Sequence, residues 1–446
     1  MKAITYDRIQ IDGGLGIQKL HEFSMSICPN QHARVKIKGT VKKEICLQEW
    51  KNSLETHVVR IFFIEENGKY PQQPVFSGYI KDISMNSEGG YDEIELEIWS
   101  GTIALDREKK CASYQDLSQS YSMILKKAIK DTDKAAAICT AGQEKKPKKP
   151  LIQYMETNWE FALRLASHLH TVIYPEVKEP RPWFWFGKPN SCGKRRLESS
   201  TYIAGISSRF YELGGVEKGY KKSDFLYYQI ETYDNFDMGV TIQYQNRDWM
   251  ICEKAAKLIG NEIVFTYILG NPQLVSLRKQ YNPVFAGMSI LGKVLSTGGE
   301  TLKIHLDIDK EQEVSTAYDY EWTPDTGSVM YCMPKVGTTV SLYFSSSDEM
   351  SARAVSCIRE NGGTCHAMSD PSKRAFNTEH GKQMYLNPDA MGFTAEASGN
   401  RILVEDEKGI SLESRQKISI VAGETVRFEG KKVIIDTPTN MRLARR

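Results

Sequence analysis

The sequence predicts a mainly β protein with a few helices. It combines two barrel units, an OB-type barrel and a C-terminal intertwined triple-stranded β-helix that three chains build together. Three observations support this fold class. Apolar and polar residues alternate along most of the chain, as is typical of half-buried strands. Helical spacing appears only in short stretches, and from residue 399 apolar residues recur every eight positions. A chain of 446 residues is long enough for two or three domains.

The composition is ordinary for a globular protein, with 41% hydrophobic and 26% charged residues. The formal net charge of +2 gives no general reason to expect a polyanionic partner. No stretch approaches about 18 consecutive apolar residues, and the N-terminus lacks the apolar core of a signal peptide. Nine scattered cysteines favour free thiols over a disulfide framework. We therefore expect synthesis in the cytoplasm, without export by a cleaved signal.

Residues 1–110 are predicted to form the first antiparallel barrel. Arg34–Lys38 and Glu93–Ile98 alternate between apolar and polar residues, which indicates strands with one buried face. Val58–Ile64 is more continuously apolar and should be buried on both faces. Turn residues such as Asn67 and Gly68 separate these runs.

Residues 111–283 are predicted to hold helices and a second barrel with inserted loops. A first helix is expected over 118–130, and a second begins at Thr157, which forms a capping box with Glu160. A third is expected from near Asn246 to Gly260, where glycine is a common stop. Strands expected between these helices span 227–231, 240–244 and 263–269.

Residues 284–362 are predicted to form a small OB-type barrel, followed by a connector over 363–398. Leu302–Asp309 alternates for eight residues, and Pro334–Phe344 gives a later strand. Five or so short strands in about 75 residues is the size of such a barrel.

Residues 399–446 carry a repeat of eight residues. In this repeat, one apolar residue recurs every eight positions, and four of the five repeats have an apolar partner two positions on. The residues are Ile402 with Val404, Ile410 with Leu412, Ile418 with Ile420, Val426 with Phe428, and Ile434.

Each of these octads predicts a short strand with one apolar face and a turn. A single ribbon of such strands is too thin to bury that face. Three chains wound around one axis would point the apolar residues inward and leave no free strand edges. Burying one Ile or Val side chain contributes about 1.5–3 kcal/mol, so the nine positions predict a trimeric needle core. The alternative is a plain antiparallel meander attached to the preceding barrel.

The order of these parts resembles the VgrG-type hub-and-spike proteins of contractile injection systems, which include type VI secretion spikes and the tail hub and spike of contractile phages and tailocins. Gln153–Phe161, followed by Arg164–Ser167, is similar to a "QY-x-ET-x-WEF…RLAS" segment of that family's hub. Weaker similarities lie at Leu105–Asp106, Tyr114–Asp116, Pro334–Val340 and Gly381–Leu386.

The resemblance implies a homotrimeric hub that docks on the inner tube protein and contacts baseplate proteins. Its needle would carry a tip protein or an effector and penetrate the target membrane mechanically, without catalysis, a cofactor or nucleic acid. The protein would be made in the cytoplasm, assembled into the particle and delivered outward on contraction. The chain departs from some phage spikes because Cys365–Asn400 is too short for a lysozyme domain. Its needle segment is also short.

No G-x-S-x-G elbow, HExxH helix, P-loop or GxGxxG motif occurs, so neither a catalytic residue nor a metal ligand is assigned. A structural role is favoured over metal binding or acid–base chemistry for three groups of residues. They are His168 and His170; Cys357, Cys365, His366 and His380; and His305, Asp307 and Asp309.

The sequence has one cluster of aromatic and basic residues, which comprises Trp183–Phe186 with Lys188 and Lys194–Arg196 nearby. Packing of its aromatic residues on the hub is favoured over stacking on single-stranded nucleic acid. Two alternatives to the spike stay open. One is a tail-associated cell-wall hydrolase, and the other is an OB-type nucleic-acid-binding protein.

Overall fold

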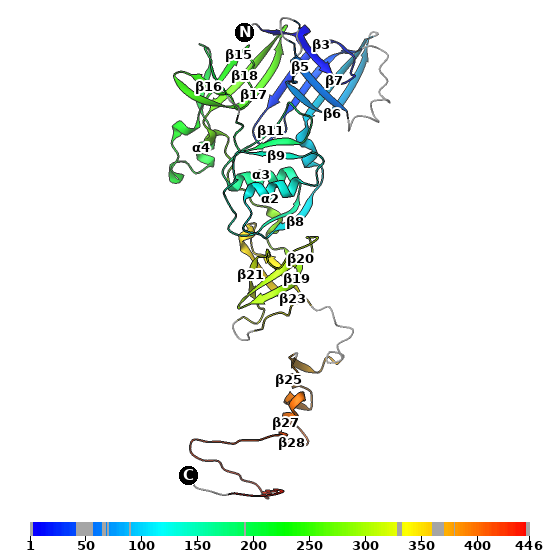
Figure 1. Cartoon of the computed structure of the whole chain (residues 1–446), viewed down its shortest axis with the longest axis vertical. Coiled ribbons are helices and arrows are strands. Elements are labelled where there is room, and N and C mark those ends of the chain that lie inside the picture. The colour runs from blue at the N-terminus through cyan, green and yellow to red at the C-terminus, as the bar shows by residue number, and fades with distance from the viewer. Residues whose placement is uncertain are drawn as a thin grey trace. The chain divides into compact units, whose positions relative to one another are not determined.

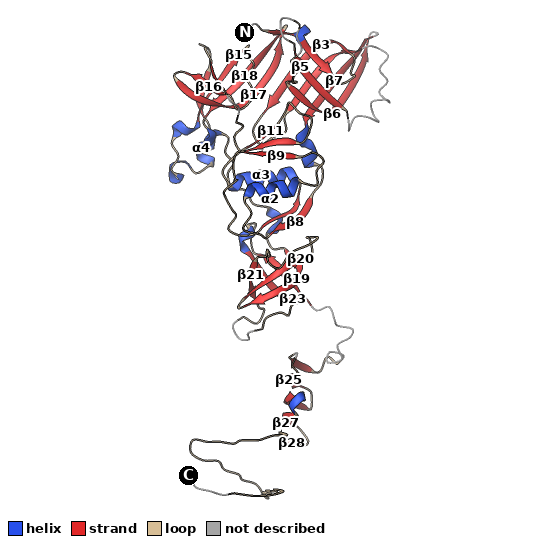
Figure 2. Cartoon of the chain, viewed as in Figure 1, coloured by secondary structure: helices blue, strands red, loops and turns tan. Residues whose placement is uncertain are grey.

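A computed structural model of the chain describes residues 3–41, 57–64, 68, 71–88, 91–190, 193–327, 332–358, 370–378 and 380–442. Two compact units make up the chain, Met1–Ile358 and Arg359–Arg446. Strands predominate in both units (Figures 1 and 2), as the sequence predicts. Within the described ranges, no helix combines the length and hydrophobicity that a membrane-spanning segment needs.

The largest sheet of the first unit has 13 strands, which come from both of the barrel units predicted from the sequence. Three short strands lie off its main path. β1 (Ile4–Thr5) pairs with β18 (Glu262–Gly270), β13 (Lys194–Arg196) pairs with β16 (Thr241–Tyr244), and β16 pairs with β17 (Arg247–Ile259). The main path runs in the order β14 (Ile203–Ile206), β15 (Leu226–Thr232), β18 (Glu262–Gly270), β17 (Arg247–Ile259), β3 (Ile17–Ile27), β4 (Arg34–Val41), β7 (Tyr91–Ser100), β6 (Phe76–Glu88), β5 (Val58–Phe63) and β2 (Ile9–Asp12).

Strands β3 and β17 join the two predicted barrels into one sheet, because Ser24–Ile27 pairs antiparallel with Lys254–Lys257. The blue N-terminal strands therefore continue into the green strands in Figure 1. Both sets of strands also contribute to one hydrophobic core, in which Val35 and Ile98 belong to the same cluster as Phe265. The sequence indicated the strands but not this shared sheet and core.

The prediction of a helix from Asn246 to Gly260 is wrong, since this stretch forms strand β17. A bulge shifts the strand's register between Ile251 and Glu253. Ile251 and Cys252 are therefore both buried, and the apolar residues before and after the bulge lie out of phase. That shift gives a strand the three- and four-residue apolar spacing of a helix.

A helical layer follows in the first unit and confirms the other two expected helices, α2 (Tyr121–Ile129) and α3 (Asn158–His168). The Thr157 side chain accepts from the backbone N–H of Glu160, and Glu160 reciprocates, so the predicted capping box is present. A further short helix, α4, spans Arg209–Glu212. The strands of this layer are β8 (Lys110–Tyr114) paired with β10 (Leu151–Glu156), and β11 (Ile173–Pro175), β12 (Trp183–Phe186) and β9 (Ala136–Cys139) in one sheet.

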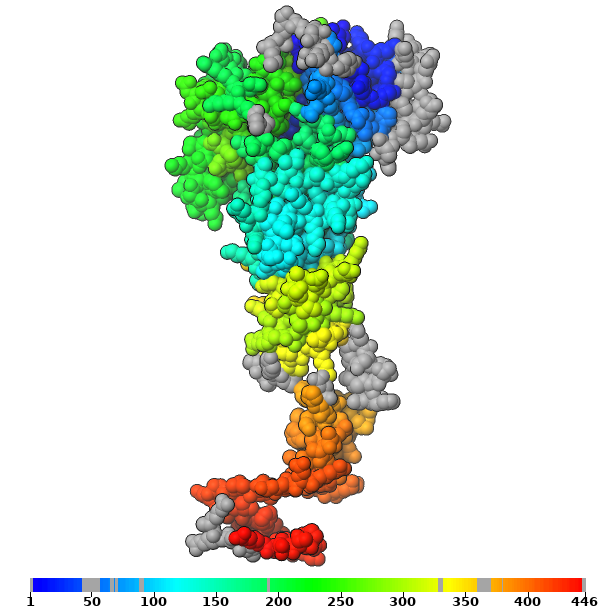
Figure 3. All heavy atoms as spheres, in the orientation of Figure 1, coloured from blue at the N-terminus to red at the C-terminus, as the bar shows by residue number. Residues whose placement is uncertain are grey.

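The closed barrel predicted from the sequence is present at the end of the first unit and encloses its own core, which includes Ile304, Leu342 and Phe344. Figure 3 shows it packed directly against the helical layer. Its strands follow the order β19 (Ser289–Gly298), β20 (Thr301–Leu306), β21 (Asp319–Thr323), β23 (Ala352–Ile358) and β22 (Thr339–Phe344).

The second unit is an antiparallel meander of five strands, after which the described residues up to 442 form neither helix nor strand. The strands are β24 (Arg374–Asn377), β25 (Lys382–Leu386), β26 (Ala390–Ala395), β27 (Asn400–Glu405) and β28 (Gly409–Glu413).

Candidate functional site

The first two octads lie on neighbouring strands of the C-terminal sheet. Ile402 on β27 faces Leu412 on β28, and Val404 faces Ile410. Because alternate residues of a strand share a face, these four side chains lie on one side of the sheet. They are 37–74% exposed, although side chains of this kind are normally buried.

The remaining octad residues are also exposed, by 44–69%, and lie where the chain forms no strand. They are Ile418, Ile420, Val426, Phe428 and Ile434. The antiparallel meander considered as an alternative thus describes the first two octads only. All nine predicted needle residues present apolar surface to solvent in a single chain, which makes this segment the candidate site of association.

The apolar face extends beyond the octads to five residues that the sequence analysis missed. Phe376, Met384, Leu386, Met391 and Phe393 come from β24 to β26 and are 42–50% exposed. Met384, Met391 and Ile402 are seven and eleven positions apart, so a search for a period of eight passes over them. A signal was available, however, because Met384 with Leu386 and Met391 with Phe393 repeat the octads' pair of apolar residues two positions apart.

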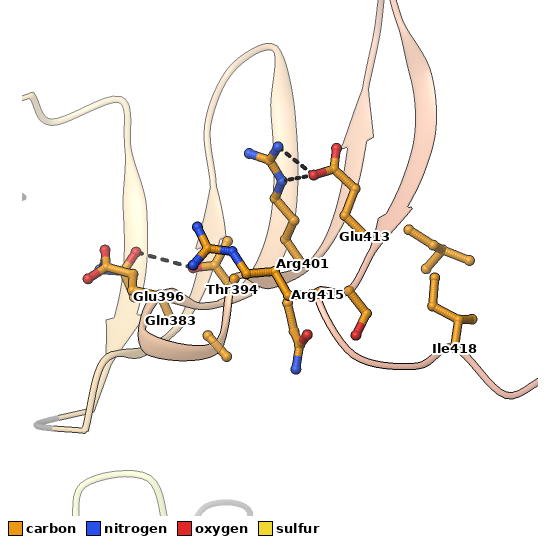
Figure 4. Close-up of a pocket in the computed structure, with 12 residues that line it drawn as sticks. Gln383, Thr394, Glu396, Arg401, Glu413, Arg415 and Ile418 are labelled. Carbon is orange, nitrogen blue, oxygen red and sulfur yellow. Dashed lines mark hydrogen bonds and ion pairs between the residues drawn. The ribbon is translucent and has the colours of Figure 1, made fainter. Parts of the chain in front are cut away.

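The opposite face of the sheet carries one polar row, formed by Asn377, Gln383, Thr394, Arg401 and Glu413, beside a second row that holds Tyr385 and Leu403. Figure 4 shows Arg401 on β27 directed at Glu413 on β28, and the Arg401 Nε and Nη2 atoms lie 2.6 and 2.5 Å from Glu413 Oε2. Both side chains are about half exposed, and an exposed ion pair contributes only about 0–1 kcal/mol. The pair lines a cavity of about 790 Å³, together with Gln383, Glu396, Arg415 and other residues.

A second feature of functional interest is the joint between the helical layer and the closed barrel, which centres on the buried guanidinium of Arg164 on α3. Arg164 Nε and Nη2 donate to the two carboxylate oxygens of Glu156, each at 2.7 Å. Nη1 donates to Glu349 Oε2 at 2.7 Å, and Nη2 donates to the Ile152 carbonyl at 2.7 Å. Glu349 lies in the barrel region between β22 and β23, and its Oε1 accepts from the Ile152 N–H at 2.6 Å.

The charges of this joint are removed from water. Arg164 is 2%, Glu349 5% and Glu156 9% exposed. Burial raises the pKa of Glu156, although Arg164 acts to lower it. Burial alone would lower the pKa of Arg164, but Glu349 and Glu156 raise it above its ordinary value. The guanidinium therefore stays charged and holds both carboxylates.

A further set of hydrogen bonds adds to the joint. Ser113 on β8 donates its N–H and hydroxyl to the two carboxylate oxygens of Asp309, at 2.6 and 2.5 Å. Gln115 donates to the Ile304 carbonyl at 3.0 Å and accepts from the Tyr318 N–H at 3.1 Å. Together with Arg164, these contacts attach the barrel to the helical layer at several separate points.

The structure separates the three residues His305, Asp307 and Asp309, which the sequence analysis considered together. Asp309 is engaged by Ser113, His305 Nε2 lies 3.0 Å from the Asp309 carbonyl oxygen, and Asp307 is exposed beyond the end of β20. Burial raises the pKa of Asp309. These contacts give His305 and Asp309 structural roles.

The other histidines and cysteines singled out from the sequence are dispersed. His168 Nε2 lies 3.1 Å from the Gln280 carbonyl, and His170 Nδ1 lies 3.2 Å from that of Leu277. Cys357 is a free thiol on β23, whereas Cys365 and His366 lie outside the described residues. In the parts of the chain that the structure describes, no three His, Cys, Asp or Glu side chains are grouped to hold a metal ion.

The aromatic cluster forms strand β12, in which Phe184 and Phe186 are buried in the core of the helical layer. The indole N–H groups of Trp183 and Trp185 donate to the Lys134 carbonyl and to Glu176. The packing that the sequence favoured for these aromatic residues is therefore present. Of the basic residues nearby, Lys194 is paired with Asp248.

His168 predicts a pH dependence of stability. Burial, with the positive charges of Arg164 and Lys279, lowers its pKa to about 4. In the unfolded chain the pKa of the His168 side chain is near 6.5. Between pH 4 and pH 6.5 the unfolded chain therefore binds more protons than the folded chain. The contribution of neutral His168 to the free energy of unfolding should therefore be fully present above pH 6.5. The free energy of unfolding should fall by up to about 3 kcal/mol as the pH drops to 4.

Thermal unfolding of the full chain from pH 7 to pH 4.5 measures this effect. His168→Gln keeps a donor for the Gln280 carbonyl but does not titrate, so its melting temperature should fall less steeply with acid. Equal slopes for the wild type and the variant would contradict the assignment.

Comparison of the structure with solved structures places this fold among known proteins. An E. coli protein, described as a component of the type VI secretion system with structural similarity to bacteriophage T4 tail proteins, aligns with a TM-score of 0.55 at 15% identity. The alignment covers 79% of this chain and 99% of that one. A chain of a Francisella PdpA–VgrG complex aligns with a TM-score of 0.57 at 8% identity, over 89% and 76% of the two chains.

A second structure of the Francisella complex gives a TM-score of 0.55 at 9% identity, over 91% of this chain and 87% of that one. No protein-family model and no curated protein matches the sequence. At such low identities the alignments show a common fold, and they confirm at that level the resemblance to hub-and-spike proteins.

Proposed function

We propose that the chain is the hub-and-spike subunit of a contractile injection system, either phage-tail-like or type VI, and that it works as a homotrimer. The observation that carries the proposal is the combination of the hub-and-spike fold with a row of exposed apolar octads at its C-terminal end. The fold supplies the general role. The octads supply the reason for association, because one chain leaves all nine residues exposed. Three chains wound around one axis would cover these residues and leave no free strand edges.

The partners follow from this role. The hub would dock on the inner tube protein and on baseplate proteins, and the needle would carry a tip protein or an effector toward the target membrane. The subunit would be made in the cytoplasm, assembled into the particle and delivered outward on contraction. Its work is mechanical rather than catalytic, and penetration of the envelope depends on the stiffness of the needle and of the joint at Arg164.

Light scattering of the purified full chain tests the proposal directly. A particle with the mass of three chains is expected, and it should resist mild denaturant through its C-terminal segment. A monomer at micromolar concentration would overturn the proposal.

A further inference from the structure

The closed barrel carries two exposed thiols, Cys332 and Cys357. The other cysteines in the described ranges are buried or half-buried. Strand β23 ends at Ile358, so Cys357 lies at the end of that strand. Cys332 lies in the segment between β21 and β22 and belongs to neither helix nor strand. Neither thiol has a role in the hub-and-spike function.

A β-bulge at Ser356 sets the direction of the Cys357 side chain. The register of β22 against β23 shifts next to the pair formed by Val340 and Cys357. Ser356 is the extra residue, with a φ of 46°, and its hydroxyl donates to the Asp325 carboxylate at 3.1 Å. Opposed residues on neighbouring strands point to the same face, and Val340 is buried in the barrel core. The bulge therefore turns Cys357 toward the inside of the barrel end.

Trp322 holds Cys332 near the same place. Trp322 lies on β21, which pairs in parallel with β23, and it is opposite Ala354. Its indole N–H donates to the Cys332 carbonyl at 2.9 Å. Both Trp322 and Met333, the residue after Cys332, pack against the barrel core. The backbone of Cys332 therefore lies at the inner side of β21 and β23, toward which the Cys357 side chain points.

We propose that Cys332 and Cys357 of one chain form a disulfide when the protein meets a small-molecule disulfide as oxidant. The thiolate of one cysteine attacks a sulfur atom of the oxidant, whose S–S bond breaks and releases one thiol. The other cysteine then attacks this mixed disulfide, which forms the bond within the chain and releases a second thiol. The protein loses two electrons and two protons, and the oxidant gains them.

The ionisation of Cys357 agrees with this pairing. Burial raises the pKa of the Cys357 thiol, and the negative charges of Cys332 and Asp325 act in the same direction. Because Coulomb interactions weaken with distance, an effect of one thiol on the other indicates that the two are neighbours. A raised pKa leaves little thiolate at neutral pH, and the thiolate is the reactive form. Formation of the disulfide should therefore become faster as the pH rises above neutrality.

The segment that holds Cys332 can adapt to the geometry of a disulfide. The bond needs Cα atoms about 4.4–6.8 Å apart. Residues 332–335 form neither helix nor strand, so they can adjust while the strands of the barrel keep their pairing. The bond would then tie β23 to the segment beside Trp322, directly before the first unit ends at Ile358.

The proposed delivery gives this bond a time at which to form. A subunit made in the cytoplasm keeps its thiols reduced, and it meets more oxidising conditions after it has been delivered outward. The barrel end would be free to adjust during assembly and would be fixed after delivery. This timing rests on the proposed function, whereas the disulfide itself does not.

Peptide mapping of the purified full chain tests the bond. The protein is incubated with oxidised glutathione at about pH 8, where more thiolate is present. It is then blocked with iodoacetamide and digested with trypsin without reduction. Trypsin cuts after Lys and Arg, which places Cys332, Cys357 and Cys365 in three separate peptides, Glu311–Lys335, Ala354–Arg359 and Glu360–Lys373.

We expect the peptides of Cys332 and Cys357 to be joined and to separate again in dithiothreitol. Iodoacetamide adducts on both residues after oxidation would overturn the proposal. A join between either peptide and that of Cys365 would overturn it as well, because a different pair would then have formed.

A non-reducing denaturing gel shows whether the bond lies within one chain. The oxidised protein should run as a single chain, and a band of two or three chains that dithiothreitol removes would contradict the proposal. Neither this gel nor the peptide map depends on the oligomeric state. A chain that forms the bond but is a monomer by light scattering would overturn the proposed function and leave this inference intact.

Thermal unfolding supplies matched variants. The oxidised wild type should melt roughly 4–8 °C above the reduced protein. Cys332→Ser and Cys357→Ser should each abolish this difference. Cys139→Ser removes a half-buried thiol of the helical layer and should keep the difference. Loss of the difference in Cys139→Ser, or its persistence in Cys332→Ser, would assign the effect to another pair and overturn the proposal.

Discussion

Ile418→Asp is expected to abolish the trimer. Ile418 is the central octad residue and is 52% exposed in the single chain. On a common axis, the substitution would place three carboxylates in an apolar interior, where an unpaired charge costs at least several kcal/mol. The dissociation constant should increase by far more than about a hundredfold, or the carboxylates should bind protons and restore the trimer at low pH.

Ser419→Asp is the matched control, since in the strand that this octad is expected to form in the trimer the next residue would point to the other side. It adds the same charge to the same segment and should leave the trimer intact. Thermal melting followed by light scattering distinguishes the two variants. If Ile418→Asp melts like the wild type, Ile418 does not lie on the axis.

Arg164→Met should cause the largest loss of stability within one subunit. It removes the only cation that donates to both Glu156 and Glu349 in the described joint, and both carboxylates remain buried. Removing one partner from a buried ion pair costs about 3–5 kcal/mol. Because Glu349 belongs to the closed barrel and Arg164 to α3, the barrel should also unfold separately from the helical layer, as a second transition in urea.

Lys178→Met provides the comparison at the surface. Lys178 lies 2.7 Å from Asp237, the same distance as Arg164 from Glu349, but its side chain is 34% exposed and that of Asp237 is 54% exposed. An exposed pair of this kind contributes about 0–1 kcal/mol. Replacing all three joint residues, with Arg164→Met, Glu156→Gln and Glu349→Gln, should recover part of the loss, because no buried charge is then unpaired. Equal losses for Arg164→Met and Lys178→Met would contradict this account of the joint.

The parts of the fold that local sequence determines were predictable. Helix α3 begins at a capping box, and both residues of that box are visible in the sequence. The closed barrel follows from alternating strands close together in the chain. Strand β17 was misassigned because its bulge disturbs the alternation on which such a prediction depends.

The candidate site was predictable only where it is periodic. The octads from Ile402 to Ile434 were found because their turns have equal lengths, whereas Phe376 and Met391 were missed because the turns around them differ. The joint was beyond prediction for another reason. Arg164 and Glu349 are 185 positions apart, and nothing in a single sequence pairs two charges over that separation.

The pairing of β3 with β17 has a consequence for the synthesis of the protein. Strand β3 is complete at residue 27, but its partner is complete only after residue 257. At roughly 5–20 residues per second, β3 waits on the order of 10–50 s on the ribosome with one edge unpaired. An open strand edge readily pairs with another chain. Nascent chains that stop before β17 should therefore aggregate, and a chaperone that shields this edge during translation should raise the yield of soluble protein.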